Sequence, residues 1–151
     1  MLSKYILIFL LATVTLAEAK GRSMKLNAGI ITKNLEASKD FYVNKLGLKV
    51  RFESDFYLLL HTEGKVDTEI AFLLPNHPTQ TDIFKSEFNG KGVFITIEVE
   101  NVDKVYKEIK AKQIPIVLEI KDEEWGDRHF AIQDPNGVGI DFVTHTPPIQ
   151  K

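Results

Sequence analysis

The order of predicted strands and helices repeats once along the chain, and this duplication restricts the possible folds more than any other feature. The first predicted unit comprises a strand at residues 26–32, a helix that Asn34 can cap, and strands at residues 48–53, 56–61 and 68–74. Asn101 lies 67 residues after Asn34 and again separates a predicted strand, residues 93–100, from a predicted helix. Three strands follow again, so the sequence predicts two strand–helix–three-strand units and an α+β fold.

The two units imply a single domain with short flanks. They span residues 26–74 and 93–144, and a polar connector with two prolines, residues 75–92, joins them with an expected helical turn at residues 83–88. The predicted domain therefore covers residues 26–146, and residues 147–151 form a tail.

The N-terminus has the three parts of a secretory signal peptide. Lys4 precedes an apolar run from Tyr5 to Ala17, and Ala17-Glu18-Ala19 matches a cleavage site. This run of about a dozen residues is too short to span a bilayer comfortably. We expect cleavage of residues 1–19, a linker at residues 20–25, and a secreted or periplasmic protein with no membrane partner. If translation starts at Met24 instead, we expect a cytoplasmic protein.

The overall composition excludes several classes of function. The formal net charge is −2 and the basic residues form no stripe, so nucleic acid is not an expected partner. The chain has no cysteine, which excludes disulfides, thiol nucleophiles and zinc–thiolate sites. No Ser-His-Asp order and no phosphate-binding glycine loop is present.

The final predicted strands form a β-hairpin with a characteristic sequence. Trp125-Gly126-Asp127-Arg128 begins the first strand, and Asp134-Pro135-Asn136-Gly137 has the residue types of a tight turn before the second. Asp127, Arg128 and Asp134 are expected to form one charge cluster that holds the hairpin. The order of these motifs resembles the closing hairpin of the glyoxalase/bleomycin-resistance/extradiol-dioxygenase superfamily, also called vicinal oxygen chelate (VOC) proteins.

The resemblance covers residues 26–144 and implies a specific architecture. Two βαβββ units would form a curved, mixed, eight-stranded sheet with the helices on the convex face and a ligand cleft on the concave face. A homodimer is expected, as is common in this superfamily. The fold hosts lyases, dioxygenases and drug-binding proteins, so it does not identify the ligand.

The resemblance also identifies four positions where metal-dependent members carry His or Glu ligands. In this chain these positions are Asn27, Ala71, Phe94 and Asp141. A phenyl ring and a methyl group cannot ligate a metal, and an amide is a weak ligand beside imidazole. We therefore expect no metal cofactor. A noncanonical divalent site built from His61, Glu69, His129 and Asp141 is the alternative.

The residues expected to face the cleft describe a mostly apolar small-molecule site. The predicted ligand-binding residues are Asn27, Tyr57, Glu69, Phe94, Thr96, Trp125, His129, Gln133 and Asp141. The expected function is binding of a small organic molecule. The first alternative is a VOC enzyme, such as a glyoxalase-like lyase, isomerase or dioxygenase, in which His129 and Asp141 are the catalytic candidates. The second is a non-catalytic structural dimer. His145 is expected to lie in a tail without partners.

Overall fold

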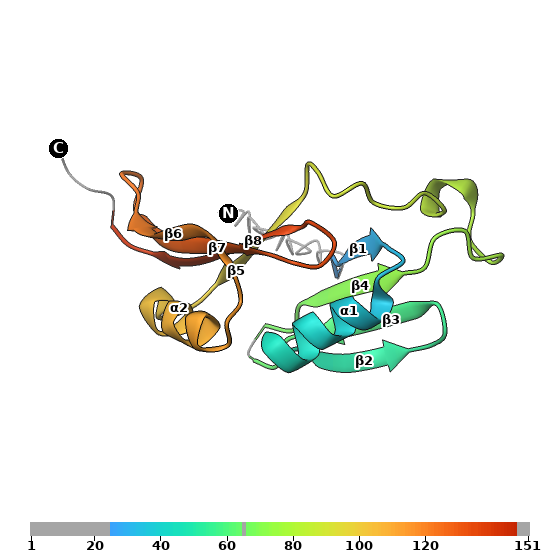
Figure 1. Cartoon of the computed structure of the whole chain (residues 1–151), viewed down its shortest axis with the longest axis horizontal. Coiled ribbons are helices and arrows are strands. Elements are labelled where there is room, and N and C mark those ends of the chain that lie inside the picture. Colours follow the sequence, from blue (N-terminus) through green and yellow to red (C-terminus); the bar gives the residue numbers. More distant parts are fainter. Residues whose placement is uncertain (1–24, 65, 148–151) are drawn as a thin grey trace, which may run out of the picture.

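The computed structural model describes residues 25–64 and 66–147, which form two units joined by the connector (Figure 1). The signal peptide predicted at residues 1–19 lies outside this range. Among the described residues, none of the helices has the length and apolar character needed to cross a membrane.

Both units have the predicted element order. The first contains β1 (Ala28–Ile31), α1 (Leu35–Lys39), the π-helical segment η1 (Asp40–Lys45), β2 (Lys49–Glu53), β3 (Tyr57–His61) and β4 (Glu69–Leu73). The second contains β5 (Phe94–Glu98), α2 (Val102–Ala111), β6 (Ile116–Asp122), β7 (Asp127–Gln133) and β8 (Gly139–His145). The connector carries one short 3₁₀ turn, η2 (Asp82–Phe84). The βαβββ duplication and the α+β class are thus confirmed.

The strands form two hydrogen-bonded sheets of four, with the same order in each. The orders are β1-β4-β3-β2 and β5-β8-β7-β6. In each sheet the first strand of the unit pairs in parallel with the last, and the remaining pairs are antiparallel. The eight strands expected in one curved sheet therefore divide between two mixed sheets.

Alternation along the strands gives each sheet one buried face and one open face. Leu58, Leu60, Ile70 and Phe72 point into the core of the first unit, and Phe130, Ile132, Ile140 and Phe142 do so in the second. The buried faces pack on α1 and α2, and the side chains of both units belong to one continuous core. All nine predicted ligand-binding residues consequently lie on the open faces or in adjacent loops.

The two equivalent helix starts differ in their capping. The Asn101 side chain accepts a hydrogen bond from the backbone N–H of Lys104 at 2.9 Å, which confirms the predicted N-cap. Asn34 makes no side-chain capping bond. Its ψ of 43° departs from the extended backbone that a capping residue needs. The Thr32 hydroxyl accepts from the Asn34 N–H instead, at 2.9 Å.

A hydrogen-bond network joins the final hairpin turn, residues 134–137, to the first unit. We call this contact between the two units the seam. The Tyr42 hydroxyl donates to Asp134 at 3.1 Å, and the Asn136 amide donates to the Ser38 hydroxyl at 2.9 Å. Thr32 donates to the Asn136 side-chain carbonyl at 2.7 Å. Asp134 and Ser38 are buried. The turn therefore fixes one unit against the other.

The single charge cluster predicted for Asp127, Arg128 and Asp134 is wrong. Arg128 binds Asp103 through two nitrogens, at 2.8 and 2.7 Å, and Asp122 through the third, at 2.8 Å. Arg128 and Asp127 are adjacent in β7, so their side chains point to opposite faces of the sheet. Asp134 lies at the other end of the hairpin, in the buried seam.

Candidate functional site

The open face of the second sheet places His129 between two carboxylates. Its Nδ1 lies 2.9 Å from Asp141 Oδ1, and its Nε2 lies 3.1 Å from Glu123 Oε1. Asp141 comes from the adjacent strand β8, whereas Glu123 follows β6 in the hairpin turn. Lys121 forms an ion pair with Glu123 from the other side. The predicted His129–Asp141 pair thus exists as part of a larger cluster.

The cluster engages both nitrogens of the imidazole. An ionised carboxylate only accepts hydrogen bonds, so both contacts can be hydrogen bonds only when both ring nitrogens carry a proton. The His129 side chain is 14% exposed, which leaves little room for a ligand to reach it. In this arrangement His129 has no free nitrogen with which to take a proton from a substrate.

Phe94 provides an exposed aromatic ring on the open face, and Thr96 follows it on the same face of β5. Phe94 is 73% exposed and lies opposite Gly139, while Thr96 lies opposite Asp141. A Cβ built at Gly139 would lie 3.5 Å from the Phe94 Cβ, so the missing side chain leaves one flank of Phe94 open. Gln133, also opposite Gly139, donates to the backbone carbonyl of Gly137 at 3.1 Å. An aromatic side chain this exposed on a sheet face is available for contact with another molecule.

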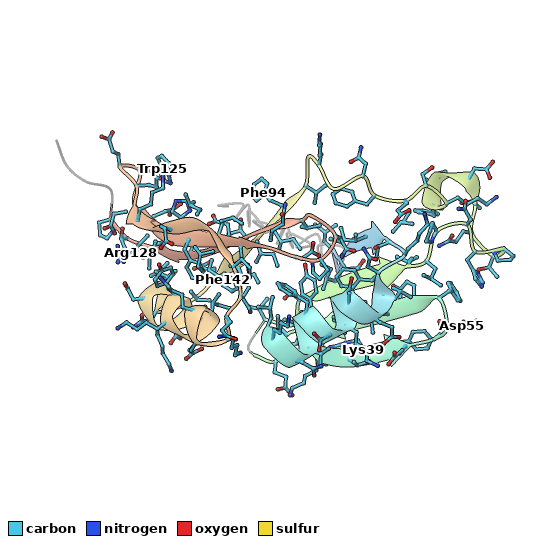
Figure 2. All side chains as sticks on the ribbon, in the orientation of Figure 1. Lys39, Asp55, Phe94, Trp125, Arg128 and Phe142 are labelled. Carbon is cyan, nitrogen blue, oxygen red and sulfur yellow. The ribbon has the colours of Figure 1, made fainter. Side chains whose placement is uncertain are left out.

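Trp125 lies in the turn between β6 and β7, near the outer end of the second sheet (Figure 2). It is 63% exposed, and its indole N–H donates to Asp127 Oδ2 at 2.9 Å. The other Asp127 oxygen lies 2.7 Å from His145 Nδ1. This bond to Asp127 is the main cause that raises the pKa of His145. The expectation that His145 lacks partners is therefore wrong, because β8 continues to this residue and brings it beside β7.

The open face of the first sheet carries the other three predicted residues. The Asn27 amide lies 3.5 Å from Glu69 Oε2, the limit for a hydrogen bond. Tyr57 packs near Phe52, with ring centroids 6.1 Å apart. His61 is partly covered, and its Nδ1 lies 3.1 Å from the Thr62 carbonyl oxygen. Sequence reasoning missed the two cations that bind Glu69, which are Lys25 and Arg51.

The residues at the family's metal positions do not fit a divalent ion. Ala71 and Phe94 carry no donor atom, and the Asp141 carboxylate is engaged by His129. Within residues 25–64 and 66–147, no group of three or more His, Asp or Glu side chains is arranged to hold a metal. The alternative set of His61, Glu69, His129 and Asp141 is therefore not assembled.

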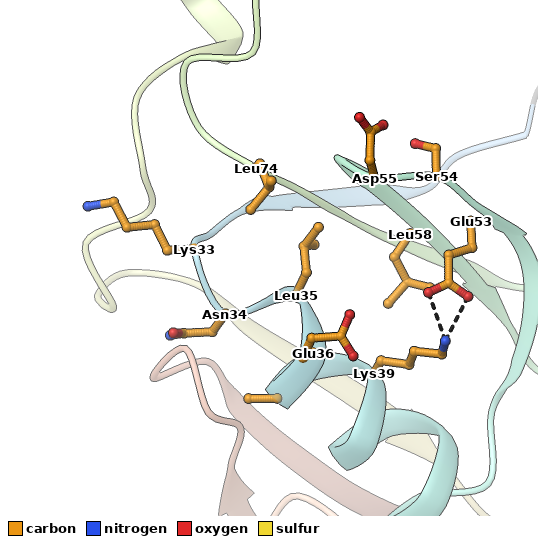
Figure 3. A pocket seen from close by; sticks show the side chains of 11 residues that line it. Lys33, Asn34, Leu35, Glu36, Lys39, Glu53, Ser54, Asp55, Leu58 and Leu74 are labelled. Carbon is orange, nitrogen blue, oxygen red and sulfur yellow. Dashed lines mark hydrogen bonds and ion pairs between the residues drawn. The ribbon is translucent and has the colours of Figure 1, made fainter.

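Two cavities lie away from the predicted ligand-binding residues. One, of about 460 Å³, lies between α1 and the turn that joins β2 to β3, with the Lys39–Glu53 ion pair in its wall (Figure 3). The other, of about 370 Å³, lies where the end of the first helical segment meets α2 and β5. None of the nine predicted residues lines either cavity. The candidate site is thus a pair of open sheet faces.

Solved structures with the same fold include proteins with different named roles. A glyoxalase/bleomycin resistance protein/dioxygenase from Nocardioides is 21% identical, with a TM-score of 0.69 over 86% of this chain and 90% of that one. TnmS3, an antibiotic binding protein from Streptomyces sp. CB03234, is 19% identical, with a TM-score of 0.66 over 83% and 98%. Lactoylglutathione lyase from Agrobacterium tumefaciens is 17% identical, with a TM-score of 0.64 over 81% and 93%.

The family assignment depends on a separate comparison of the sequence. A search among curated proteins found no match. The comparison with protein families matched residues 26–142, which include both βαβββ units up to the middle of β8. The chain therefore belongs to the Glyoxalase/Bleomycin resistance protein/Dioxygenase superfamily.

Proposed function

We propose that this protein binds a small organic molecule with a flat apolar surface, without the divalent metal of the family's enzymes. The observation that carries the proposal is Phe94, an exposed aromatic ring at a position where metal-dependent members have a ligand. A phenyl ring there replaces coordination by stacking and apolar contact. TnmS3, which shares the fold, is described as antibiotic binding, which supports this class of function.

The polar residues around Phe94 suit recognition better than catalysis. Thr96 and Gln133 can exchange hydrogen bonds with a ligand. Trp125 offers a second exposed aromatic surface, at the opposite end of β7. His129, Asp141 and Glu123 mainly satisfy one another. This gives an apolar contact surface with a few orienting polar groups, as small-molecule sites usually have.

A second copy of the chain is proposed to pack against outer strands of the two sheets. Val50 and Phe52 on β2 and Val117 on β6 are exposed apolar residues of such strands. Large exposed apolar side chains favour association when a second copy can bury them. Size-exclusion chromatography with light scattering should give twice the monomer mass.

Export after cleavage at Ala19 is proposed on the basis of the N-terminal sequence. Mass spectrometry of the mature protein checks it. A chain that begins at Lys20 supports a secreted or periplasmic location, and one that begins at Met24 supports a cytoplasmic one.

Replacement of Phe94 by alanine is expected to weaken ligand binding about tenfold, since a lost aromatic contact costs about 1.4 kcal/mol. Hits are first selected from planar polycyclic compounds by thermal shift, because a ligand that binds the folded state raises its stability. Affinities are then measured through the fluorescence of Trp125, the only tryptophan.

The matched control for this prediction is Phe84→Ala, because Phe84 is also exposed but lies on η2 in the connector. Equal affinities for the two variants would refute Phe94 as the contact residue. Stoichiometric Ni, Zn, Mn or Fe in the purified protein would overturn metal-free binding.

A catalytic role for His129 with Asp141 is the second candidate, favoured by their 2.9 Å contact. Lactoylglutathione lyase shares the fold, which makes an assay for lactoylglutathione lyase activity the first choice. Turnover by the wild-type protein that is lost in His129→Gln would establish catalysis by His129. A wild-type rate no higher than the uncatalysed rate would exclude catalysis for this substrate.

A further inference from the structure

One carboxylate on the open face of the first sheet is shielded from solvent by its neighbours. It therefore requires a positive charge nearby. The Glu69 side chain is only 7% exposed. It lies beside Asn27 and two residues before Ala71, both of which occupy family metal positions. An ionised carboxylate this well covered is costly unless a positive charge compensates it. A divalent ion would be one way to supply that charge.

Two side chains of the protein supply this charge. Lys25 Nζ lies 2.7 Å from Glu69 Oε1, and Arg51 Nε lies 3.0 Å from the same oxygen. Each cation also contacts Asp67, with Lys25 Nζ 3.0 Å from Oδ2 and Arg51 Nη2 2.7 Å from Oδ1. Two cations and two carboxylates thus form a closed ring with balanced charge.

The protonation of the ring agrees with this geometry. The hydrogen bond from Lys25 lowers the pKa of both Glu69 and Asp67, and Arg51 lowers them further. The hydrogen bond to Glu69 is the main cause that raises the pKa of Lys25. Lys25, Asp67 and Glu69 are therefore charged at neutral pH.

We propose that Lys25 and Arg51 are built-in replacements for the metal charge on the first sheet and exclude divalent cations from Glu69. An incoming ion would have to displace two nitrogens that already contact Oε1. It would also meet a ring with no net negative charge, so no long-range attraction would compensate for dehydration of the ion. This inference rests on the proposed metal-free function. It gives the reason why Glu69, in the first unit, would not bind a divalent ion.

The inference predicts that removal of both cations creates a cation site. In Lys25→Met/Arg51→Met, the carboxylate oxygens of Glu69 and Asp67 would both lose their counter-charges. Oxygen donors of this kind suit Mn²⁺. We expect one equivalent of Mn²⁺ to bind at least tenfold more tightly than to the wild-type protein, as measured by calorimetry and electron paramagnetic resonance. Addition of Glu69→Gln should abolish this gain.

The matched control is Lys33→Met/Lys39→Met, which removes the same charge but frees Glu87 and Glu53, each from a separate ion pair. The milder Arg51→Met serves if the double variant does not fold, with a smaller gain expected, and Arg51→Lys should retain exclusion. Stoichiometric Mn²⁺ binding by the wild-type protein that Glu69→Gln removes would overturn the proposal. So would a folded double variant that binds Mn²⁺ no better than the control. The first outcome would also overturn metal-free binding, whereas the second would leave the Phe94→Ala prediction untouched, so these two failures are distinguishable.

Discussion

Replacement of Asp134 by alanine is expected to destabilise the protein by about 3–4 kcal/mol. Asp134 is 5% exposed and accepts hydrogen bonds from the Tyr42 hydroxyl, the Asn136 side chain, and the backbone N–H groups of Asn136 and Val138. Truncation removes these acceptors and leaves buried donors without partners, which costs more than the bonds themselves contribute. Urea denaturation followed by circular dichroism measures the change.

Two control variants distinguish the loss of a buried hydrogen-bond acceptor at Asp134 from the loss of its negative charge. Asp122→Ala removes an exposed carboxylate from the end of β6, the strand next to the final hairpin, and we expect a loss below about 1 kcal/mol because surface ion pairs contribute little. Tyr42→Phe removes one bond of the buried network and should cost about 1 kcal/mol. If Asp134→Ala costs no more than Asp122→Ala, the seam does not join the units as described.

The same network has a pH dependence with a defined sign. Burial first, and then the nearby Asp134, raise the pKa of Tyr42. A group whose pKa is raised on folding contributes its full stability below its unfolded pKa, which is about 10 for tyrosine. The contribution is then lost as the pH rises further. The stability difference between wild type and Tyr42→Phe should accordingly remain constant from about pH 6 to about pH 9.

Local sequence signals predicted the elements but not the contacts between them. The turn residues at 134–137 predicted the final hairpin, and alternation predicted which residues share a sheet face. The partners of Asp134 were not predictable, because Tyr42 lies 92 residues earlier and the turn signal contains no information about what the turn packs against. The two equivalent asparagines, Asn34 and Asn101, show the same limit, since only the second caps its helix.

The candidate site was predicted in part for similar reasons. His129 and Asp141 were paired correctly because both lie on the open face of neighbouring strands. Glu123 was missed because the β6–β7 pairing has irregular register, so the position of the turn relative to His129 cannot be counted from the sequence. The nine residues were expected in a single cleft because of the family resemblance, and alternation alone cannot tell how the two sheets are placed relative to each other.

Replacement of Gly137 by alanine is expected to cost about 2–3 kcal/mol. Gly137 has a φ of +86°, a conformation that costs a residue with a side chain about 1–2 kcal/mol. A Cβ there would also lie 3.2 Å from both the Cα and the carbonyl oxygen of Gly90, in the connector. Backbone atoms cannot turn away as a flexible side chain can, so the connector or the turn would have to shift.

Gly47→Ala isolates the first of these causes, the positive φ. Gly47 ends the first helical segment with a φ of +88°, almost the same as Gly137, but a Cβ there would meet nothing within 4 Å. Gly47→Ala should therefore cost only the free energy of placing a side chain at positive φ, about 1–2 kcal/mol. The difference between the two variants, measured by urea denaturation, reports the close approach of the connector to the final turn. Equal losses would mean that Gly90 and Gly137 are not packed against each other, and the seam would then depend on the Asp134 network alone.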